Sequence, residues 1–169
     1  MSFVEPQDVM EVVEGMISLL FKELKGIELQ QPFPRMTWES AMARFGSDKP
    51  DIRFGLELVD FTDALRNSKA KVFAAAIEKG GGVKGIRIPA GADLSRKDLD
   101  DMTPYVAAFG AKGIAWTRLT AEGWQSPIAK FLSESEQKEI ETIAGAAVGD
   151  VILFSADTFK IVNDALGNL

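Results

Sequence analysis

Apolar side chains recur at helical spacing over the first part of the chain. Residues 6–25 place seven of them three or four positions apart, which predicts one long amphipathic helix: Val9, Val12, Val13, Met16, Ile17, Leu20 and Leu24. Pro6 suits the first helical position, and Gly26 suits the position after the last turn. An extended segment should follow at residues 32–36, because each of its two prolines biases the preceding residue away from helix.

A short second helix is predicted over residues 38–45, with Thr37 as its N-cap and Gly46 as its terminator. Residues 47–51, with the sequence Ser-Asp-Lys-Pro-Asp, then predict a turn and an extended exit, since Asp48 favours side-chain turns and Pro50 favours extension. The residues alone therefore indicate a stiff joint between two structural units, in which Lys49 and Asp51 pair on the surface.

Strand patterns alternate with helix patterns from residue 55 onward. Strands are predicted at residues 56–59, 71–77, 83–89, 114–119 and 151–155, and helices at 61–66, 96–109, 134–144 and 158–166. Pro104 predicts a kink, or a restart capped by Thr103, while Ser133 and Glu136 have capping-box spacing. The alternation predicts an α+β fold, a two-layer domain in which helices pack on one face of a mainly antiparallel sheet.

Composition limits the function classes. The 169 residues are 46% hydrophobic and contain no cysteine, which excludes thiol chemistry and fits the cytoplasm. No apolar run approaches the roughly 18 residues of a membrane span, and the first residues lack the pattern of a signal peptide. The net charge of −6 is spread evenly over residues 1–54 and 55–169, so neither part is a basic nucleic-acid module, although a local basic patch remains open.

Candidate catalytic motifs are weak. Residues 80–85 match G-x-G-x-x-G, but a strand pattern follows where the dinucleotide fingerprint needs a helix, so a glycine-rich hairpin is favoured. The chain has no histidine, which removes the commonest general base. The acids at Asp98, Asp100 and Asp101 lie in a helix pattern rich in charge and indicate a solvated face rather than an acid–base pair.

Two tryptophans and three cations occur close together in the second half of the chain. Trp116 and Trp124 flank a predicted turn; such aromatics can stack on bases, but a cross-strand packing pair is favoured. Lys112, Arg118 and Lys130 could form a small basic patch there, with scattered solvated charges as the alternative.

Several runs in a fixed order resemble the bacterial-type aspartyl-tRNA synthetases, which are class II enzymes. The most specific run is residues 44–54, Arg-Phe-Gly-Ser-Asp-Lys-Pro-Asp-Ile-Arg-Phe, and others lie at residues 8–16, 36–42, 54–60, 71–73, 86–89, 94–97, 110–116, 126–132 and 149–154. The resemblance implies a catalytic-core segment at residues 1–54 and, at 55–169, the inserted GAD domain with the start of the return to the core. That insertion is shared with a subunit of the bacterial tRNA-dependent amidotransferase.

The resemblance also implies what the chain lacks. The longer enzyme would be a cytoplasmic homodimer that attaches aspartate to tRNA using ATP and Mg²⁺, but the family's arginines for ATP and its groups for aspartate have no counterpart among these residues. We therefore expect an inactive fragment with no catalytic, cofactor-binding or metal-binding residue, and with tRNA and the rest of the synthetase as partners. Candidate contacts to tRNA or to the other domains are Ser47, Asp48, Lys49, Lys112, Arg118 and Lys130.

Two other functions stay open at this point. One is a stand-alone, non-enzymatic adaptor that binds tRNA or a protein, and a weaker one is a small-ligand sensor, which no motif supports. The sequence leaves open whether the longer enzyme charges only the aspartate tRNA or also the asparagine tRNA.

Overall fold

The structure is a computed structural model that describes residues 3–169. The chain falls into two compact units that meet between Met36 and Thr37. The first unit holds one helix, α1 (Pro6–Lys25), followed by a segment without regular secondary structure. Gly26 ends α1 in the left-handed conformation, with φ +66°, and Pro6 opens it, so the predicted helix is confirmed. No residue of α1 is buried.

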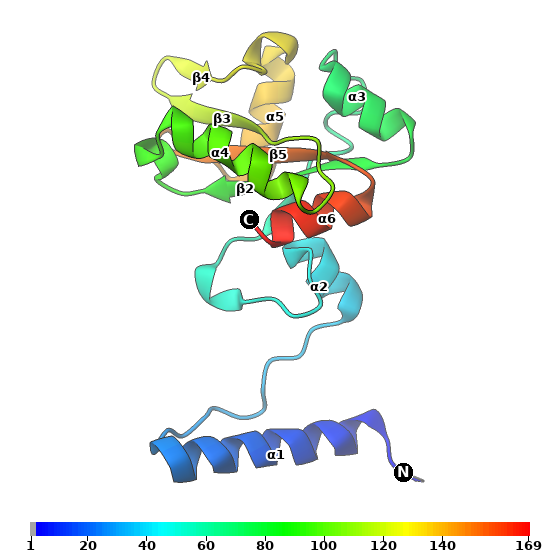
Figure 1. Cartoon of the computed structure of the whole chain (residues 1–169), viewed down its shortest axis with the longest axis vertical. Helices are drawn as coiled ribbons and strands as arrows, with labels where there is room; N and C mark the ends of the chain where they lie inside the picture. The colour runs from blue at the N-terminus through cyan, green and yellow to red at the C-terminus, as the bar shows by residue number, and fades with distance from the viewer. Residues whose placement is uncertain (1–2) are drawn as a thin grey trace. The chain divides into compact units, whose positions relative to one another are not determined.

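The second unit is built on a five-stranded sheet in which all the strand pairs are antiparallel (Figure 1). Its spatial order is β1-β2-β5-β3-β4. The strands are β1 (Leu58–Asp60), β2 (Gly82–Ile88), β3 (Ala115–Thr120), β4 (Gly123–Gln125) and β5 (Val151–Asp157). The last strand in sequence is thus the central one, and it joins the pair β1–β2 to the pair β3–β4.

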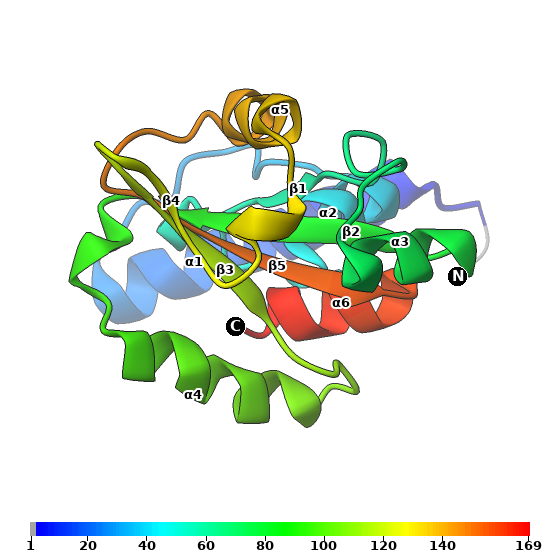
Figure 2. The ribbon, with the colours of Figure 1, turned by 90° about the horizontal axis from the view of Figure 1, so that it is seen from above.

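Helices cover both faces of this sheet. The remaining helices are α2 (Trp38–Phe45), α3 (Lys71–Glu78), α4 (Arg96–Ala107), α5 (Glu134–Ala144) and α6 (Phe159–Gly167), with short 3-10 helices at Ile52–Phe54, Gly91–Asp93 and Ala129–Phe131. Figure 2 shows α5 on one side of the sheet and α4 and α6 on the other.

The central strand explains why both faces are covered. In β5, Ile152 and Phe154 belong to a core with α3 and α5, whereas Val151 and Leu153 belong to a core with α4 on the opposite face. The α+β class and the antiparallel sheet are therefore confirmed, but the expected placement of helices on one face only is wrong. A strand with apolar side chains on both faces must be covered on both, and β5 is such a strand.

The predicted strand at residues 71–77 is also wrong, because this segment forms α3. Phe73 and Ile77 lie four residues apart and both pack in the core, which is a helical spacing, while Val72, next to Phe73, is 67% exposed. Gly80 and Gly81 consequently connect a helix to β2 and do not form a hairpin. These glycines still precede a strand, so the exclusion of a dinucleotide site remains valid.

Most helix boundaries agree with the sequence. The hydroxyl of Thr37 caps α2, Ser133 and Glu136 form the capping box of α5, and Thr158 caps α6. Two details differ. Residues 62–67 form consecutive turns where the sequence predicts a helix over residues 61–66, and α4 runs through Pro104 without a restart at Thr103.

Candidate functional site

The predicted joint at residues 47–51 begins where the end of α2 meets α6. Gly46 has φ +69°, and a Cβ placed on it would lie 2.4 Å from the carbonyl oxygen of Asn163. A Cβ on Gly167 would lie 2.7 Å from the carbonyl oxygen of Phe45. Two glycines therefore allow the backbones of α2 and α6 to touch, and α2 is fixed to the sheet-containing unit.

A buried lysine lies at the same contact. Lys84 of β2 is only 5% exposed, and its Nζ donates hydrogen bonds to the carbonyl of Ala43 at 3.1 Å and to Oδ1 of Asn163 at 2.9 Å. Burial lowers the pKa of the Lys84 ammonium, and the negative charge of Asp60 opposes that shift. Lys84 thus connects β2 to both α2 and α6, and the two hydrogen bonds that it donates indicate a structural role.

The joint itself exposes its charges. Asp48 and Lys49 are exposed, and the backbone N–H of Lys49 donates to the hydroxyl of Ser47 at 3.1 Å. The expected ion pair between Lys49 and Asp51 is replaced by one between Arg53 and Asp51, in which Arg53 Nε donates to Oδ1 at 2.8 Å. The side-chain hydrogen bond from Arg53 lowers the pKa of Asp51 to about 2. The guanidinium forms part of the same local turn as its acceptor, and this proximity decides the pairing.

The three cations of the second half lie in different settings. Arg118 is half-buried and donates to the carbonyl of Leu94, so it braces β3 against the segment before α4. Lys112 is exposed and lines a depression of about 470 Å³ beside α3. Lys130 is exposed and lines a separate depression of about 480 Å³ near α5. The structure does not bring these side chains together as one patch.

The two tryptophans lie on opposite faces of the sheet, so the expected cross-strand pair is wrong. Trp124 faces Leu119 across β3–β4, and its indole N–H donates to Glu141 of α5 at 2.6 Å. Trp116 is 9% exposed and packs with Leu99 in the core on the other face. Leu119 follows Trp116 by three positions in β3, and an odd offset places two side chains of a strand on opposite faces.

The depression beside α3 is the feature that sequence reasoning missed. Its floor is apolar, with Phe73 and Phe154, and Lys79 and Lys112 lie at its rim. Several of its lining residues belong to α3, the segment for which the sequence predicts a strand at residues 71–77, so the depression was not predicted. The helical spacing of Phe73 and Ile77 was the available signal.

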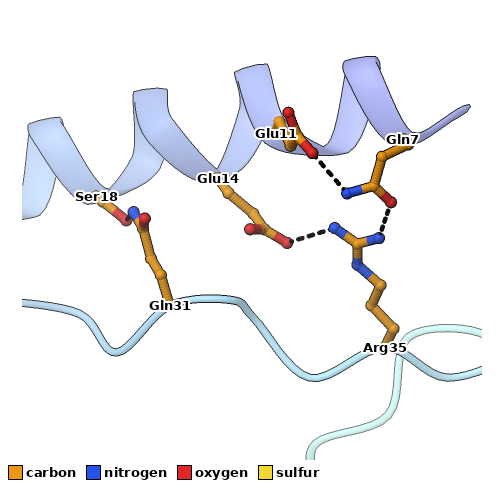
Figure 3. A network of polar contacts seen from close by, with 6 residues as sticks. All are labelled: Gln7, Glu11, Glu14, Ser18, Gln31 and Arg35. Atoms are coloured by element: carbon orange, nitrogen blue, oxygen red, sulfur yellow. Dashed lines mark hydrogen bonds and ion pairs between the residues drawn. The ribbon is translucent and has the colours of Figure 1, made fainter. Parts of the chain in front are cut away.

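In the first unit, a polar network fixes the segment that follows α1 (Figure 3). Arg35 donates to Gln7 and, at 3.4 Å, to Glu14, and Gln31 donates to Ser18. Polar side chains of α1 therefore bond to the segment of the same chain that follows the helix. These residues are not among those that the sequence predicted to be functional.

No metal site or membrane span is found within residues 3–169. No three side chains of His, Cys, Asp or Glu come together in the described part of the chain, and no helix in it is both long enough and apolar enough to cross a bilayer. The acids of α4 are engaged locally: Asp98 closes a capping box with Ser95, and Asp101 accepts from Lys97 at 2.7 Å. The interpretation of this helix face as solvated is confirmed.

These features define a small α+β domain, and comparison with known families identifies its class. A family profile described as the GAD domain matches residues 73–166, from α3 to α6, and the chain belongs to this family.

Similarity to longer proteins extends over the whole chain. The chain is 48% identical, over 100% of the chain's length, to the aspartate–tRNA(Asp/Asn) ligase of Syntrophotalea carbinolica. It is 50% identical to the ligase of the same name from Natranaerobius thermophilus. It is 47% identical to the aspartate–tRNA ligase of Lactiplantibacillus plantarum. The chain spans only 28% of the first of these relatives. The resemblance to aspartyl-tRNA synthetases is confirmed.

Proposed function

We propose that this chain is the GAD-containing part of a ligase that attaches aspartate to tRNA with ATP, and that the part is itself non-catalytic. The observation that carries the proposal is the extent of the similarity. Identity of 48% continues through residues that lie outside the GAD match, including α1, α2 and the joint. The residues before 55 would then belong to the catalytic core, and the remainder to the insertion.

The arginine side chains already contact acceptors within the chain, and this supports a non-catalytic role. Activation of an amino acid by ATP needs positive charge placed opposite the developing phosphate charge. Each arginine of this chain contacts an acceptor within the chain: Arg35 with Glu14, Arg44 with Glu57, Arg53 with Asp51, Arg66 with Asp63, Arg87 with Asp150, Arg96 with Asp100 and Arg118 with the carbonyl of Leu94. ATP and Mg²⁺ would be held by other residues of the longer enzyme, a cytoplasmic homodimer.

Activity of the isolated chain tests this proposal. Purified residues 1–169 should give ATP–pyrophosphate exchange at the background level when supplied with aspartate, ATP and Mg²⁺. A full-length relative such as the Lactiplantibacillus plantarum ligase serves as the positive control. Exchange by the chain clearly above background would overturn the non-catalytic assignment.

We further propose that the exposed cations assist tRNA binding within the longer enzyme. Lys49, Lys112 and Lys130 are all exposed, and lysines that contact phosphates add salt-dependent affinity. A gel shift with the chain alone should show weak binding at low salt that weakens further after Lys112→Glu or Lys130→Glu. Lys97→Glu, at an exposed lysine paired with Asp101, is the matched control.

The same gel shift distinguishes the proposed part of a ligase from the alternative function, a stand-alone adaptor. A stand-alone adaptor would bind tRNA tightly without the rest of a synthetase, and its affinity would fall steeply with salt. Tight binding by the isolated chain would favour that function over the proposed part of a ligase.

A further inference from the structure

The ladder between β3 and β5 stops before β5 ends. The N–H of Leu119 donates to the carbonyl of Asp150 at 2.9 Å, and Ala115 is the last β3 residue in register, opposite Phe154. In an antiparallel ladder the residues that bond to one neighbour alternate along the strand. The even-numbered residues of β5 therefore direct their backbone N–H and C=O groups toward β3.

Ala156 is the next such residue, and it has no strand beside it. The register would place Gly113 opposite Ala156, but β3 begins only at Ala115. On the other side its neighbour Val83 turns away, because the carbonyl of Val83 accepts from Phe61 N–H at 2.8 Å and its N–H donates to Thr62 Oγ1 at 3.0 Å. Within residues 3–169 no hydrogen bond satisfies the backbone N–H or C=O of Ala156.

This unpaired donor and acceptor face the depression beside α3. Ala156 and Gly113 both line it, together with Phe73 and Phe154. A volume of about 470 Å³ accommodates a few residues of extended chain. Unsatisfied strand edges are sites at which another chain adds as a strand.

The charges around the depression indicate the chemistry of the chain that would fit. Lys79 at the end of α3 and Lys112 before β3 are both exposed and line it, whereas Asp157 is the one lining acid. Phe73 and Phe154 are each only 1% exposed, so their rings offer no stacking platform for a nucleic-acid base. A backbone donor–acceptor pair also matches a peptide unit better than a phosphate.

We propose that this groove binds an extended, acidic peptide segment of a partner protein, which adds as a short strand beside Ala156. Apolar side chains of the peptide pack against Val72, which lines the groove and is 67% exposed, and its carboxylates lie near Lys79 and Lys112. This interaction goes beyond the proposed role in a ligase, and it does not depend on that role.

A defined peptide and amide NMR test the proposal on the 1–169 chain. The probe is acetyl-Glu-Val-Glu-Val-Glu-amide, and its matched control carries lysine in place of each glutamate. We expect the acidic peptide to shift the amide signals of Ala156 and Gly113 and to slow hydrogen exchange at Ala156, whereas the lysine peptide should do neither. An acidic peptide whose valines are N-methylated keeps the charge, removes strand hydrogen bonds and should bind more weakly.

Charge reversal locates the site. The Lys79→Glu/Lys112→Glu double variant should weaken binding of the acidic peptide at least about tenfold, because it replaces two attractive charges by two repulsive ones. Lys130→Glu, in the separate depression, should leave the affinity unchanged. Both lysines are exposed, and an unaltered amide spectrum elsewhere verifies folding.

Three results would overturn the proposal. The first is an acidic peptide that leaves Ala156 unperturbed, and the second is affinity that survives the double charge reversal. The third is a hexauridine oligonucleotide that shifts Ala156 and Gly113 while the peptide does not, which would assign the groove to RNA.

Discussion

The Nζ atom of Lys84 in β2 donates to Oδ1 of Asn163 in α6 at 2.9 Å. The same ammonium donates to the carbonyl of Ala43 in α2. This side chain therefore couples the helix that precedes the joint to the sheet and to the last helix. Only Gly46 separates the end of α2 from the joint, so the position of the joint depends on this buried contact.

Replacing Lys84 by methionine should destabilise the chain. The change leaves the Ala43 carbonyl and the Asn163 amide oxygen without their donor, which costs about 1–3 kcal/mol when the acceptors stay buried. Urea unfolding at neutral pH measures the loss. Lys97→Met, at an exposed lysine paired within α4, should leave the free energy of unfolding nearly unchanged, because solvent screens an exposed ion pair.

The effect of Lys84→Met should also depend on pH. Burial lowers the pKa of folded Lys84 below its usual value of 10.5, so at alkaline pH the unfolded chain binds more protons at this group than the folded chain does. The wild-type chain then gains stability as the pH rises toward 10.5, and the methionine variant lacks this gain. A stability difference that narrows as the pH rises would contradict this account.

Gly46→Ala should cost more than Gly55→Ala. Both glycines have a positive φ, +69° and +65°, but a Cβ on Gly46 would meet the Asn163 carbonyl at 2.4 Å, whereas nothing lies within 4 Å of one on Gly55. Gly55→Ala should cost only the strain of the left-handed conformation, about 1 kcal/mol. Gly46→Ala adds a backbone clash and should lose at least about 2 kcal/mol more. Equal melting temperatures would show that α2 and α6 can separate freely.

Asp150→Asn tests a second buried polar cluster. Burial alone would raise the pKa of Asp150, but N–H groups of Ala147 and Ala90 and the Arg87 guanidinium outweigh it, so the pKa is lowered overall. A lowered folded pKa stabilises the fold above the unfolded value of 3.8, and this stabilisation is lost as the pH falls through the folded pKa.

The asparagine variant should therefore lose about 1–3 kcal/mol at pH 7, and the gap to wild type should close in acid. Denaturant melts between neutral and acidic pH measure both effects. Asp100→Asn, which removes an exposed pair with Arg96 at 3.6 Å, is the control and should have little effect at any pH. A gap for Asp150→Asn that persists unchanged in acid would disprove the carboxylate's role.

The starts of several helices could be predicted from the sequence because a capping hydrogen bond joins residues that are close along the chain. Thr37, Ser133 and Thr158 each accept a hydrogen bond from the backbone N–H three positions ahead, and that spacing is visible in the sequence alone. The helix at Lys71–Glu78 has no capping side chain, since Ala70 stands at its N-cap. Without that signal its apolar residues also suited a strand, and only the packing of Phe73 and Ile77 decides the structure.

Features that depend on long-range contacts could not be predicted. The sequence does not reveal that Lys84 lies inside, or that Arg118 is bonded to Leu94, because each partner is far away along the chain. The expected pairing of Trp116 with Trp124 failed for a related reason: the register of the β3–β4 turn places Trp124 opposite Leu119. The family resemblance identified the domain but gave none of these contacts.

The exposed apolar side of α1 predicts self-association of the isolated chain. Val12 is 71% exposed and Leu24 is 75% exposed, and no residue of this helix is buried. Exposed apolar patches of this kind drive association. Sedimentation should show concentration-dependent oligomers, and Val12→Glu/Leu24→Glu should shift the chain toward monomer. Glu23→Gln, a polar change on the same helix, should leave the distribution unchanged.

The central position of β5 has a consequence for the order of events during synthesis. Its neighbours β2 and β3 are both made well before it, yet they are joined in the sheet only through it. A nascent chain that has not yet released residues 151–157 can hold the two halves of the sheet only as separate pieces. Contacts between segments distant in sequence slow folding and leave strand edges open meanwhile. The five-stranded sheet can therefore be completed only after β5 has been synthesised.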